Sequence, residues 1–271
     1  MSLRCLYTDL DGTLLGHHGS LFRDAEGSFS LKQARTLEAC DRAGVEVVIM
    51  SGRREAQVMA IAGLLAQTSY IYEAGCGVMI EGERTLLTGD WLPDDDGTPA
   101  DKIQAAGIPE LLFERFPGRL EWHRPWHRER QLSHLFRGRI EVAEANALLA
   151  EHGHDDLRFL DNGAIVRRME GLDGPAHAYH LVPGGASKAK AVAFHMRARG
   201  YGPDACIGIG DSLEDLDVAE VVGRFFVVAN GPERDPGLRE AIGGRPNVTV
   251  TEGRNGDGVY EAVVSTLAER R

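Results

Sequence analysis

Along this chain, short apolar runs alternate with longer segments of helical periodicity. The runs cover residues 3–7, 45–50, 70–72, 205–209, 225–228 and 248–250, and they contain few polar positions. Such runs are typical of strands that are buried on both faces. Helical patterns follow them at about residues 30–43, 51–67, 187–199, from 214, 233–242 and 259–270. The alternation predicts an α/β fold with a doubly wound parallel sheet, or Rossmann-like core.

Local signals refine these predictions near the start of the chain. Ser30 and Gln33 have the spacing of a capping box, which predicts that a helix begins there, and Gly44 predicts its end. Residues 78–80 and 85–87 flank a Glu-Gly-Glu sequence, which predicts a hairpin.

The pattern changes between residues 93–99, a turn-rich polar connector, and residues 183–185. Two helical patterns lie between them, at about 100–116 and 141–152, among strand-like runs at 120–123, 131–136, 157–160, 164–166 and 178–182. Helices mixed with neighbouring strands indicate a separate α+β unit. We therefore predict a core formed by residues 1–88 and 185–271, with an inserted α+β cap domain at residues 89–184.

Composition and charge narrow the functional classes. The chain has 271 residues, of which 43 % are hydrophobic, and a formal net charge of −11. A negative balance argues against nucleic acid as a partner. No apolar run approaches the roughly 20 residues that span a membrane, and residues 1–10 lack a signal-peptide pattern. We expect a cytoplasmic protein that binds neither nucleic acid nor membrane.

The four cysteines lie far apart in the sequence, and no two of them form a CxxC pair; they are Cys5, Cys40, Cys76 and Cys206. This spacing favours reduced thiols in the core over disulfides or zinc ligands.

The first apolar run leads directly into two carboxylates, Asp9 and Asp11, followed by Gly12. Side chains at i and i+2 of an extended backbone point the same way, so both carboxylates can converge on one point, and Gly12 permits a sharp turn. Converged carboxylates repel each other unless a cation or a proton lies between them. Mg²⁺ fits this arrangement because it prefers oxygen ligands. The simpler alternative is a strand that ends in an Asp-Gly turn.

Polar residues follow two further strands in the same manner. Ser51 and Asp211 come directly after apolar runs, so they and Asp9 are expected at one rim of the sheet, where doubly wound folds bind ligands. Ser51 and Gly52 at a helix start could bind an anion, or Ser51 could simply cap the helix. Arg53 could reach a substrate or face solvent.

Four segments in this order resemble the motifs of the haloacid dehalogenase (HAD) superfamily of phosphohydrolases. They are Asp-Leu-Asp-Gly-Thr at residues 9–13, Ser-Gly-Arg at 51–53, Lys188, and Gly-Asp-Ser-Leu-Glu-Asp at 210–215. The inserted unit is similar in size to the large α/β cap of one branch of this superfamily. That branch includes Cof-like sugar phosphatases, sucrose-phosphate phosphatases, mannosyl-3-phosphoglycerate phosphatases and phosphomannomutases.

The resemblance implies catalysis through an aspartyl phosphate, with Mg²⁺ as cofactor. Asp9 would be the nucleophile, and Asp11 the acid and base whose backbone carbonyl also binds the metal. Lys188 would neutralise the phosphoryl group, although Lys190 competes for this role. Asp211 would be a metal ligand, and Asp215 a second ligand or an orienter of metal-bound water.

The chain also departs from the relatives at two places. Residues 73–76 read Glu-Ala-Gly-Cys where many relatives have Asn-Gly-Ala, and Glu214 precedes Asp215 where they often have Asn. In the insertion, the basic segment at residues 123–130 could grip a leaving group or form a solvated hairpin tip. Residues 152–156 are expected to form a polar loop rather than a metal site.

The opening motif is especially like that of mannosyl-3-phosphoglycerate phosphatases. We expect a phosphatase whose partner is a small phosphorylated metabolite, of the sugar phosphate or glycosyl-phosphoglycerate type. Two alternatives stay open, a phosphomutase and a non-catalytic protein that binds a phosphometabolite. The intact set of nucleophile, acid, lysine and metal ligands argues against the second.

Overall fold

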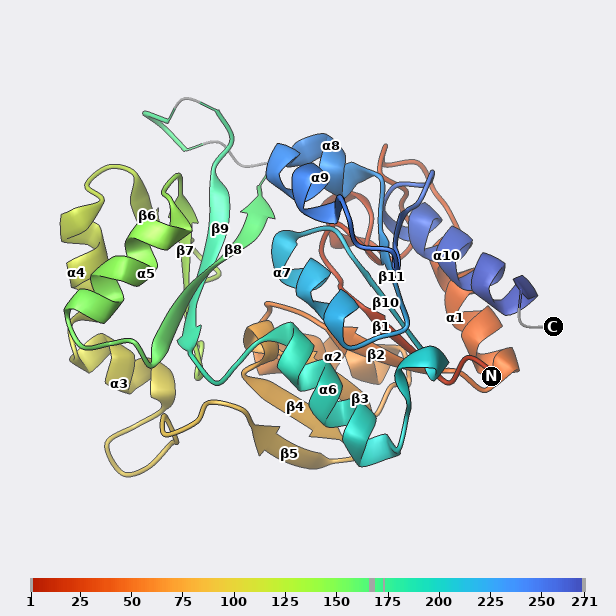
Figure 1. Cartoon of the computed structure of the whole chain (residues 1–271), viewed down its shortest axis with the longest axis horizontal. Coiled ribbons are helices and arrows are strands. Elements are labelled where there is room, and N and C mark those ends of the chain that lie inside the picture. Colours follow the sequence, from red (N-terminus) through yellow and green to blue (C-terminus); the bar gives the residue numbers. More distant parts are fainter. Residues whose placement is uncertain (1, 166–168, 173, 270–271) are drawn as a thin grey trace.

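The protein contains two β-sheets, each with its own helices (Figure 1). The computed structural model describes residues 2–165, 169–172 and 174–269.

The larger sheet has eight strands in the order β12-β11-β10-β1-β2-β3-β4-β5. Its strands from β12 to β3 are parallel, and β4 and β5 add an antiparallel hairpin at one edge. Their bounds are β1 Cys5–Thr8, β2 Glu46–Met50, β3 Ser69–Tyr72, β4 Gly77–Ile80, β5 Glu83–Leu86, β10 Cys206–Gly210, β11 Arg224–Val227 and β12 Val248–Val250. The predicted hairpin is present as β4 and β5.

Helices cover both faces of this sheet, which confirms the doubly wound α/β fold class. One face packs against α1 Lys32–Ala43, α2 Glu55–Leu64 and α10 Asn255–Glu269, and the other against α6 Lys188–Arg199, α7 Leu213–Leu216 and α9 Pro236–Ile242. Shorter elements connect them: α8 Asn230–Arg234, η1 His17–Gly19, η2 Glu73–Gly75, η3 Pro203–Ala205 and η4 Asp217–Glu220.

The smaller sheet belongs to the predicted insertion and is antiparallel, in the order β6-β7-β9-β8. It consists of β6 Leu120–Trp122, β7 His134–Gly138, β8 Leu157–Ala164 and β9 His177–Pro183, with α3 Pro99–Ala105, α4 Ile108–Arg115 and α5 Val142–Glu151 alongside. A separate hydrophobic core joins these elements, built around Leu112, Phe136 and Leu149. We call this unit the cap; its limits at residues 89 and 184 stay a prediction.

Some predicted element bounds are wrong, each for a local reason. Ser30 and Gln33 form no capping box: α1 has Leu31 at its N-cap, and the Gln33 side chain turns inward to donate to the Arg23 carbonyl at 2.7 Å. The helix predicted at 100–116 is two helices, because Gly107 adopts a left-handed conformation with φ of +72°.

Two further runs are divided differently from the prediction. The helix predicted at 233–242 is split at Asp235, whose carboxylate caps the start of α9. The runs at 157–160 and 164–166 belong largely to the single strand β8, while Val166, like Arg270 of the last helix, lies outside the described residues.

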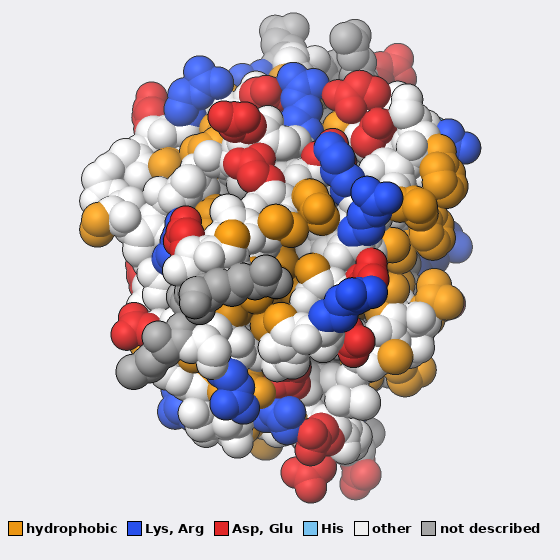
Figure 2. Space-filling view, turned by 90° about the vertical axis from the view of Figure 1, so that its right-hand side faces the viewer, with side chains coloured by type: hydrophobic (Ala, Val, Ile, Leu, Met, Phe, Trp, Pro, Cys, Tyr) orange, Lys and Arg blue, Asp and Glu red, His pale blue; other side chains and the backbone are white. Residues whose placement is uncertain are grey.

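The face of the molecule that carries α1 and α10 has acidic, basic and hydrophobic side chains intermingled (Figure 2). Within the described ranges, no helix has both the length and the apolar character needed to cross a membrane.

Candidate active site

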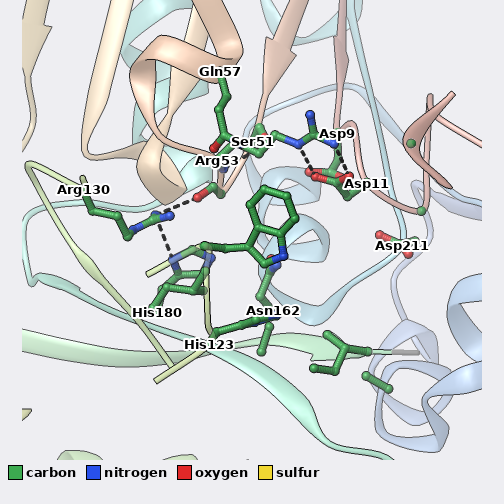
Figure 3. Close-up of a pocket in the computed structure, with 18 of the residues that line it drawn as sticks. Asp9, Asp11, Ser51, Arg53, Gln57, His123, Arg130, Asn162, His180 and Asp211 are labelled. Carbon is green, nitrogen blue, oxygen red and sulfur yellow. Dashed lines mark hydrogen bonds and ion pairs between the residues drawn. The ribbon is translucent and has the colours of Figure 1, made fainter. Parts of the chain in front are cut away.

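The register of the large sheet places the predicted site residues at one rim. Thr8 in β1 pairs with Ile209 in β10 and with Ile49 in β2. Asp9, Asp211 and Ser51 follow these three positions by one or two residues. They consequently lie together at the carboxyl ends of neighbouring parallel strands and line the same cavity (Figure 3).

Lys188 lies at the centre of this group, at the start of α6. Its side chain is only 1 % exposed, and Nζ donates to Asp9 Oδ1 at 3.0 Å and to Asp215 Oδ1 at 2.7 Å. Burial alone would lower the pKa of Lys188, but the adjacent Asp215 and Asp9 carboxylates raise it well above its ordinary value. The competing Lys190 is turned away and donates to the Gly184 carbonyl at 3.1 Å.

Asp215 is fixed by a capping box at the start of α7. Its Oδ2 accepts from the backbone amides of Asp211 and Ser212, both at 3.2 Å, and from Ser212 Oγ at 2.6 Å. Both oxygens are therefore engaged, one by these donors and one by Lys188. Asp215 orients the Asp211 backbone and the lysine at the same time.

Asp211 approaches Asp9 and Asp215 closely enough for one cation to bind all three, since one oxygen of each lies within 4.8 Å of the others. Arg234, at the end of α8, donates to Asp211 Oδ2 at 2.7 Å. Burial nevertheless raises the pKa of Asp211 to about 7 and that of Asp9 well above its ordinary range, against the opposing effects of Arg234 and Lys188. This excess of buried carboxyl groups fits a divalent cation with oxygen ligands.

Asp11 points to the cavity and forms a bidentate ion pair with Arg53. Arg53 Nε donates to Oδ2 at 2.6 Å and Nη2 to Oδ1 at 2.5 Å (Figure 3). The geometry resolves the open question about Arg53, which lines the site instead of facing solvent. It also holds Asp11 in one fixed orientation.

Ser51 is buried and does not cap a helix, because α2 begins later and has Arg54 at its N-cap. Its Oγ accepts from the Arg53 amide at 3.2 Å. Gly52 is required here because a Cβ atom would lie 2.6 Å from His180 Nε2. The loop is thus closely fitted between the core and the cap.

The cap forms the opposite wall of the cavity. Arg130 Nη2 donates to the Gly52 carbonyl at 2.7 Å and lies 3.4 Å from His180 Nδ1 (Figure 3). Burial lowers the pKa of His180 well below its ordinary value, with Arg130 adding to the effect, so this ring is neutral at neutral pH.

The cavity has a volume of about 560 Å³. Its lining away from the carboxylates is rich in amide, imidazole and aromatic groups, namely Gln57, His123, Trp126, Asn162 and His180. Trp126 is 54 % exposed, which is unusual for so large a side chain. Three members of the basic segment, His123, Trp126 and Arg130, reach the cavity, so part of that segment forms the wall.

Several residues at the site were not predicted from the sequence. Asn230 lies shortly after β11, and its side chain links the Gly12 carbonyl at 2.8 Å to the Asn255 amide at 2.7 Å. Arg234, Glu73 and His180 carried no recognisable signal, because their partners lie far away in the sequence.

Comparison with known proteins shows which family and which relatives the chain resembles. The profile of the haloacid dehalogenase-like hydrolase family matches residues 6–93. A phosphoglycolate phosphatase of Methanoculleus marisnigri is 26 % identical over 264 residues, which cover 96 % of this chain and 95 % of that protein.

Two solved structures share the fold over nearly the whole chain. The sucrose-phosphatase of Synechocystis, solved with sucrose and phosphate, has a TM-score of 0.68 at 14 % identity and covers 98 % of each chain. A Thermoplasma acidophilum protein has a TM-score of 0.65 at 16 % identity and covers 98 % of this chain and 99 % of its own. These likenesses confirm the predicted fold class, a Rossmann-like core with an inserted cap.

Proposed function

We propose the mechanism, cofactor and substrate class of this chain as a phosphatase of the haloacid dehalogenase-like hydrolases, which the family match and the phosphoglycolate phosphatase relatives support. It is a Mg²⁺-dependent enzyme that hydrolyses a sugar phosphate or a glycosyl-phosphoglycerate through a phosphorylated Asp9. Mannosyl-3-phosphoglycerate is the lead substrate.

The observation that carries the proposal is the position of Lys188 between Asp9 and Asp215, beneath the cavity. An ammonium group beside a carboxylate lowers the repulsion that a phosphate dianion meets when it approaches. Ser51 and Gly52 supply a hydroxyl and backbone amides on the adjacent wall. Catalysis of phosphoryl transfer depends mainly on such positioning and charge stabilisation.

In the first step a carboxylate oxygen of Asp9 attacks phosphorus, and the bond from phosphorus to the leaving oxygen breaks. Asp11 gives its proton to that oxygen, which departs as an alcohol. In the second step Asp11 takes a proton from water, the water oxygen attacks phosphorus, and the Asp9 carboxylate and inorganic phosphate are released. Arg53 orients Asp11 toward the cavity through the bidentate pair, and one oxygen of Asp11 has to leave that pair to carry the proton.

The residues placed to hold Mg²⁺ are Asp9, Asp211, Asp215 and the backbone carbonyl of Asp11. When bound, the ion neutralises charge on the phosphoryl oxygens. Arg234 has to share Asp211 with the ion, because it donates to Oδ2 of that residue.

The size and lining of the cavity favour a sugar-bearing substrate. A volume of about 560 Å³ equals that of roughly 19 water molecules at about 30 Å³ each, far more than a two-carbon leaving group fills. An exposed tryptophan and several amide and imidazole groups suit the faces and hydroxyls of a sugar ring. Phosphoglycolate, the substrate named for several relatives, is the smaller alternative.

The test is release of inorganic phosphate from sugar phosphates, phosphoglycerates, glycosyl-phosphoglycerates and phosphoglycolate, with and without Mg²⁺. We expect Mg²⁺-dependent turnover, fastest on a glycosylated substrate, that is abolished in Asp9→Asn. Asp41→Asn, at an exposed position of α1, is the matched control and should retain full activity.

Each result has a definite meaning. Preference for phosphoglycolate would overturn the substrate class but keep the mechanism. Transfer of phosphate within a sugar, without net release, would indicate the mutase. Absence of turnover from folded protein on every substrate would overturn the enzymatic proposal.

A further inference from the structure

A second cluster of chemically active side chains lies at the opposite end of the large sheet. Cys5 begins β1, Glu46 begins β2 and Cys206 begins β10, and Cys5 is the register partner of both others. These positions are at the amino ends of the parallel strands, whereas Asp9 lies beyond the carboxyl end of β1. His195 of α6 packs over them.

The donor atoms of Cys5, Glu46 and His195 converge. One ligand atom from each lies within 4.8 Å of the other two. Cys5 and His195 are fully buried. His195 Nε2 is buried and makes no hydrogen bond within the described structure, although Glu46 Oε1 lies 3.5 Å away. A buried ring nitrogen directed at a thiol and a carboxylate, whose contact with that carboxylate is no shorter than 3.5 Å, is an arrangement that a bound cation would complete.

We propose that Cys5, Glu46 and His195 form a binding site for one Zn²⁺ ion. The three side chains supply sulfur, oxygen and nitrogen, a donor set that zinc accepts and that Mg²⁺, which prefers oxygen alone, does not. The remaining position of a tetrahedral site is left for water.

The surroundings meet the further requirements of a zinc site. A metal-bound histidine usually has its other ring nitrogen fixed by a polar partner, and here the Tyr7 hydroxyl lies 2.8 Å from His195 Nδ1. Glu46 is held by Ser69 at 2.9 Å, Tyr201 at 2.9 Å and Arg199 at 3.1 Å. Arg199 also pairs with Glu81 at 2.7 Å, so it keeps a partner when the metal draws on Glu46.

Charge and proton balance are also satisfied. Binding of Zn²⁺ releases the thiol proton of Cys5, and the resulting thiolate and the Glu46 carboxylate together balance the two charges of the ion. Burial holds the pKa of the Cys5 thiol well above its usual range, so the thiolate forms only together with the metal.

A surface cavity of about 370 Å³ lies near the cluster. It is lined by Arg4 and Ala205, which adjoin Cys5 and Cys206 in the sequence, and by Tyr201, which donates to Glu46 Oε2 at 2.9 Å.

The expected role is structural. His195 lies seven residues after Lys188 on α6, so both side chains face the sheet from the same side of the helix. A metal that joins His195 to β1 and β2 would fix α6 against β1, the strand that leads into Asp9. The spacing of the cysteines in the sequence favoured reduced thiols over zinc ligands. Spacing can detect only ligands that are close in the sequence, whereas Cys5, Glu46 and His195 are far apart in it.

The test uses the full-length protein, stripped of metal and titrated with Co²⁺ in excess Mg²⁺, which occupies the carboxylate site. We expect a sulfur-to-cobalt charge-transfer band that saturates at one Co²⁺ per chain and disappears on addition of Zn²⁺. Cys5→Ser should abolish the band. Cys40→Ser, which alters another fully buried thiol on α1, is the matched control and should keep it. Tyr7→Phe should retain the band with affinity about 10- to 100-fold weaker.

Two results would overturn the proposal: absence of the band in folded wild-type protein, or its persistence in Cys5→Ser. If Cys5→Ser does not fold, X-ray absorption of the zinc-loaded wild type decides the question. A shell containing sulfur and imidazole nitrogen supports the site, and a shell of oxygen alone overturns it.

Discussion

Glu214 is a buried carboxyl group to which the described structure offers no hydrogen-bond donor for either oxygen. The nearest charge is Lys188, whose Nζ lies 4.0 Å from Oε2. Lys188 already serves Asp9 and Asp215, so a further anion there is poorly compensated. Burial accordingly raises the pKa of Glu214 to about 7, with Lys188 opposing the shift.

This shift predicts a pH-dependent stability. The ordinary pKa of Glu214 is 4.5, so between pH 4.5 and 7 the folded state retains a proton that the unfolded state releases. Stability therefore falls as pH rises through this window, by on the order of 3 kcal/mol at about 1.4 kcal/mol per unit. In Glu214→Gln, which cannot ionise, the contribution of Glu214 should be absent while those of Asp9 and Asp211 remain. Stability should therefore fall less steeply with pH than in the wild type, and the variant should be the more stable protein at pH 8.

The measurement is urea unfolding across this pH range in the presence of EDTA. Glu220→Gln, at an exposed position six residues later, is the control and should follow the wild type. Parallel pH profiles for Glu214→Gln and the wild type would contradict the assignment of the proton to Glu214.

Residues that act through a local motif were predictable from the sequence. Asp9, Ser51 and Asp211 follow apolar strands, so their meeting at one rim follows from the parallel sheet alone. The pairings of Arg53 with Asp11 and of Arg234 with Asp211 were not predictable. Side-chain conformation decides them, and the sequence carries no local signal for it.

A buried carboxylate in the turn after β3, that of Glu73, joins the core to the cap. The Glu73 carboxylate accepts from the amides of Gln131 and Leu132, both at 3.1 Å, and from Ser133 Oγ at 2.7 Å. Arg130 lies 3.8 Å away, and both charged side chains are almost fully buried. Glu73 has a φ of +46°, a strained conformation for a residue with a side chain, and these hydrogen bonds offset that cost.

Loss of the Glu73 carboxylate should lower the free energy of unfolding. Glu73→Ala leaves Arg130 buried without its counter-charge, which should cost roughly 3–5 kcal/mol. Glu73→Ala combined with Arg130→Met should cost less than the sum of the single changes by at least about 1 kcal/mol, since the unpaired charge is removed. The measurement is a double-mutant cycle by chemical denaturation.

The control cycle uses Glu38 and Arg42, an exposed pair on α1 whose coupling should be about 0.5 kcal/mol or less. Additivity of the Glu73 and Arg130 changes within about 0.5 kcal/mol would mean that the two side chains do not interact.

Elements were predicted in type more accurately than in extent. The core strands were found because continuous apolar runs are a strong signal. The break between α3 and α4 was missed because a glycine within an apolar pattern is compatible with a continuous helix. The order β6-β7-β9-β8 of the cap was not predictable, since it depends on pairing between strands far apart in the sequence.

At the scale of the whole molecule, the cavity does not share the negative balance of the chain. The net charge of the chain is −11, whereas three arginines and three aspartates line the cavity, namely Arg53, Arg130, Arg234, Asp9, Asp11 and Asp211. The sequence predicted a cap of suitable size between the second and third motifs. It could not predict how the cap sits on the core, because the contact between Arg130 and Gly52 spans 78 residues. That contact makes the site a joint property of both units.

A site built from both units should stabilise both when it is filled. Mg²⁺ and inorganic phosphate together, at about 100 times their dissociation constant, should add about 2.7 kcal/mol to the free energy of unfolding. For a chain of this size the melting temperature should rise by roughly 5–10 °C. Phosphate is common to every candidate substrate, so this shift reports assembly of the site independently of the leaving group.

The shift should depend on both ligands, because the carboxylate cluster repels phosphate until a cation is present. The measurement is thermal unfolding with each ligand alone and with both, which separates assembly of the site from general effects of salt. The salt controls replace phosphate with sulfate and Mg²⁺ with K⁺. Arg130→Met should reduce the joint shift, because the substitution releases the Gly52 loop from the cap. Arg130 itself does not pair with the metal-binding carboxylates of Asp9, Asp211 and Asp215; its ion pair is with Glu73. An unchanged joint shift in this variant would mean that the core binds phosphate without help from the cap, and the cap would then act on the leaving group alone.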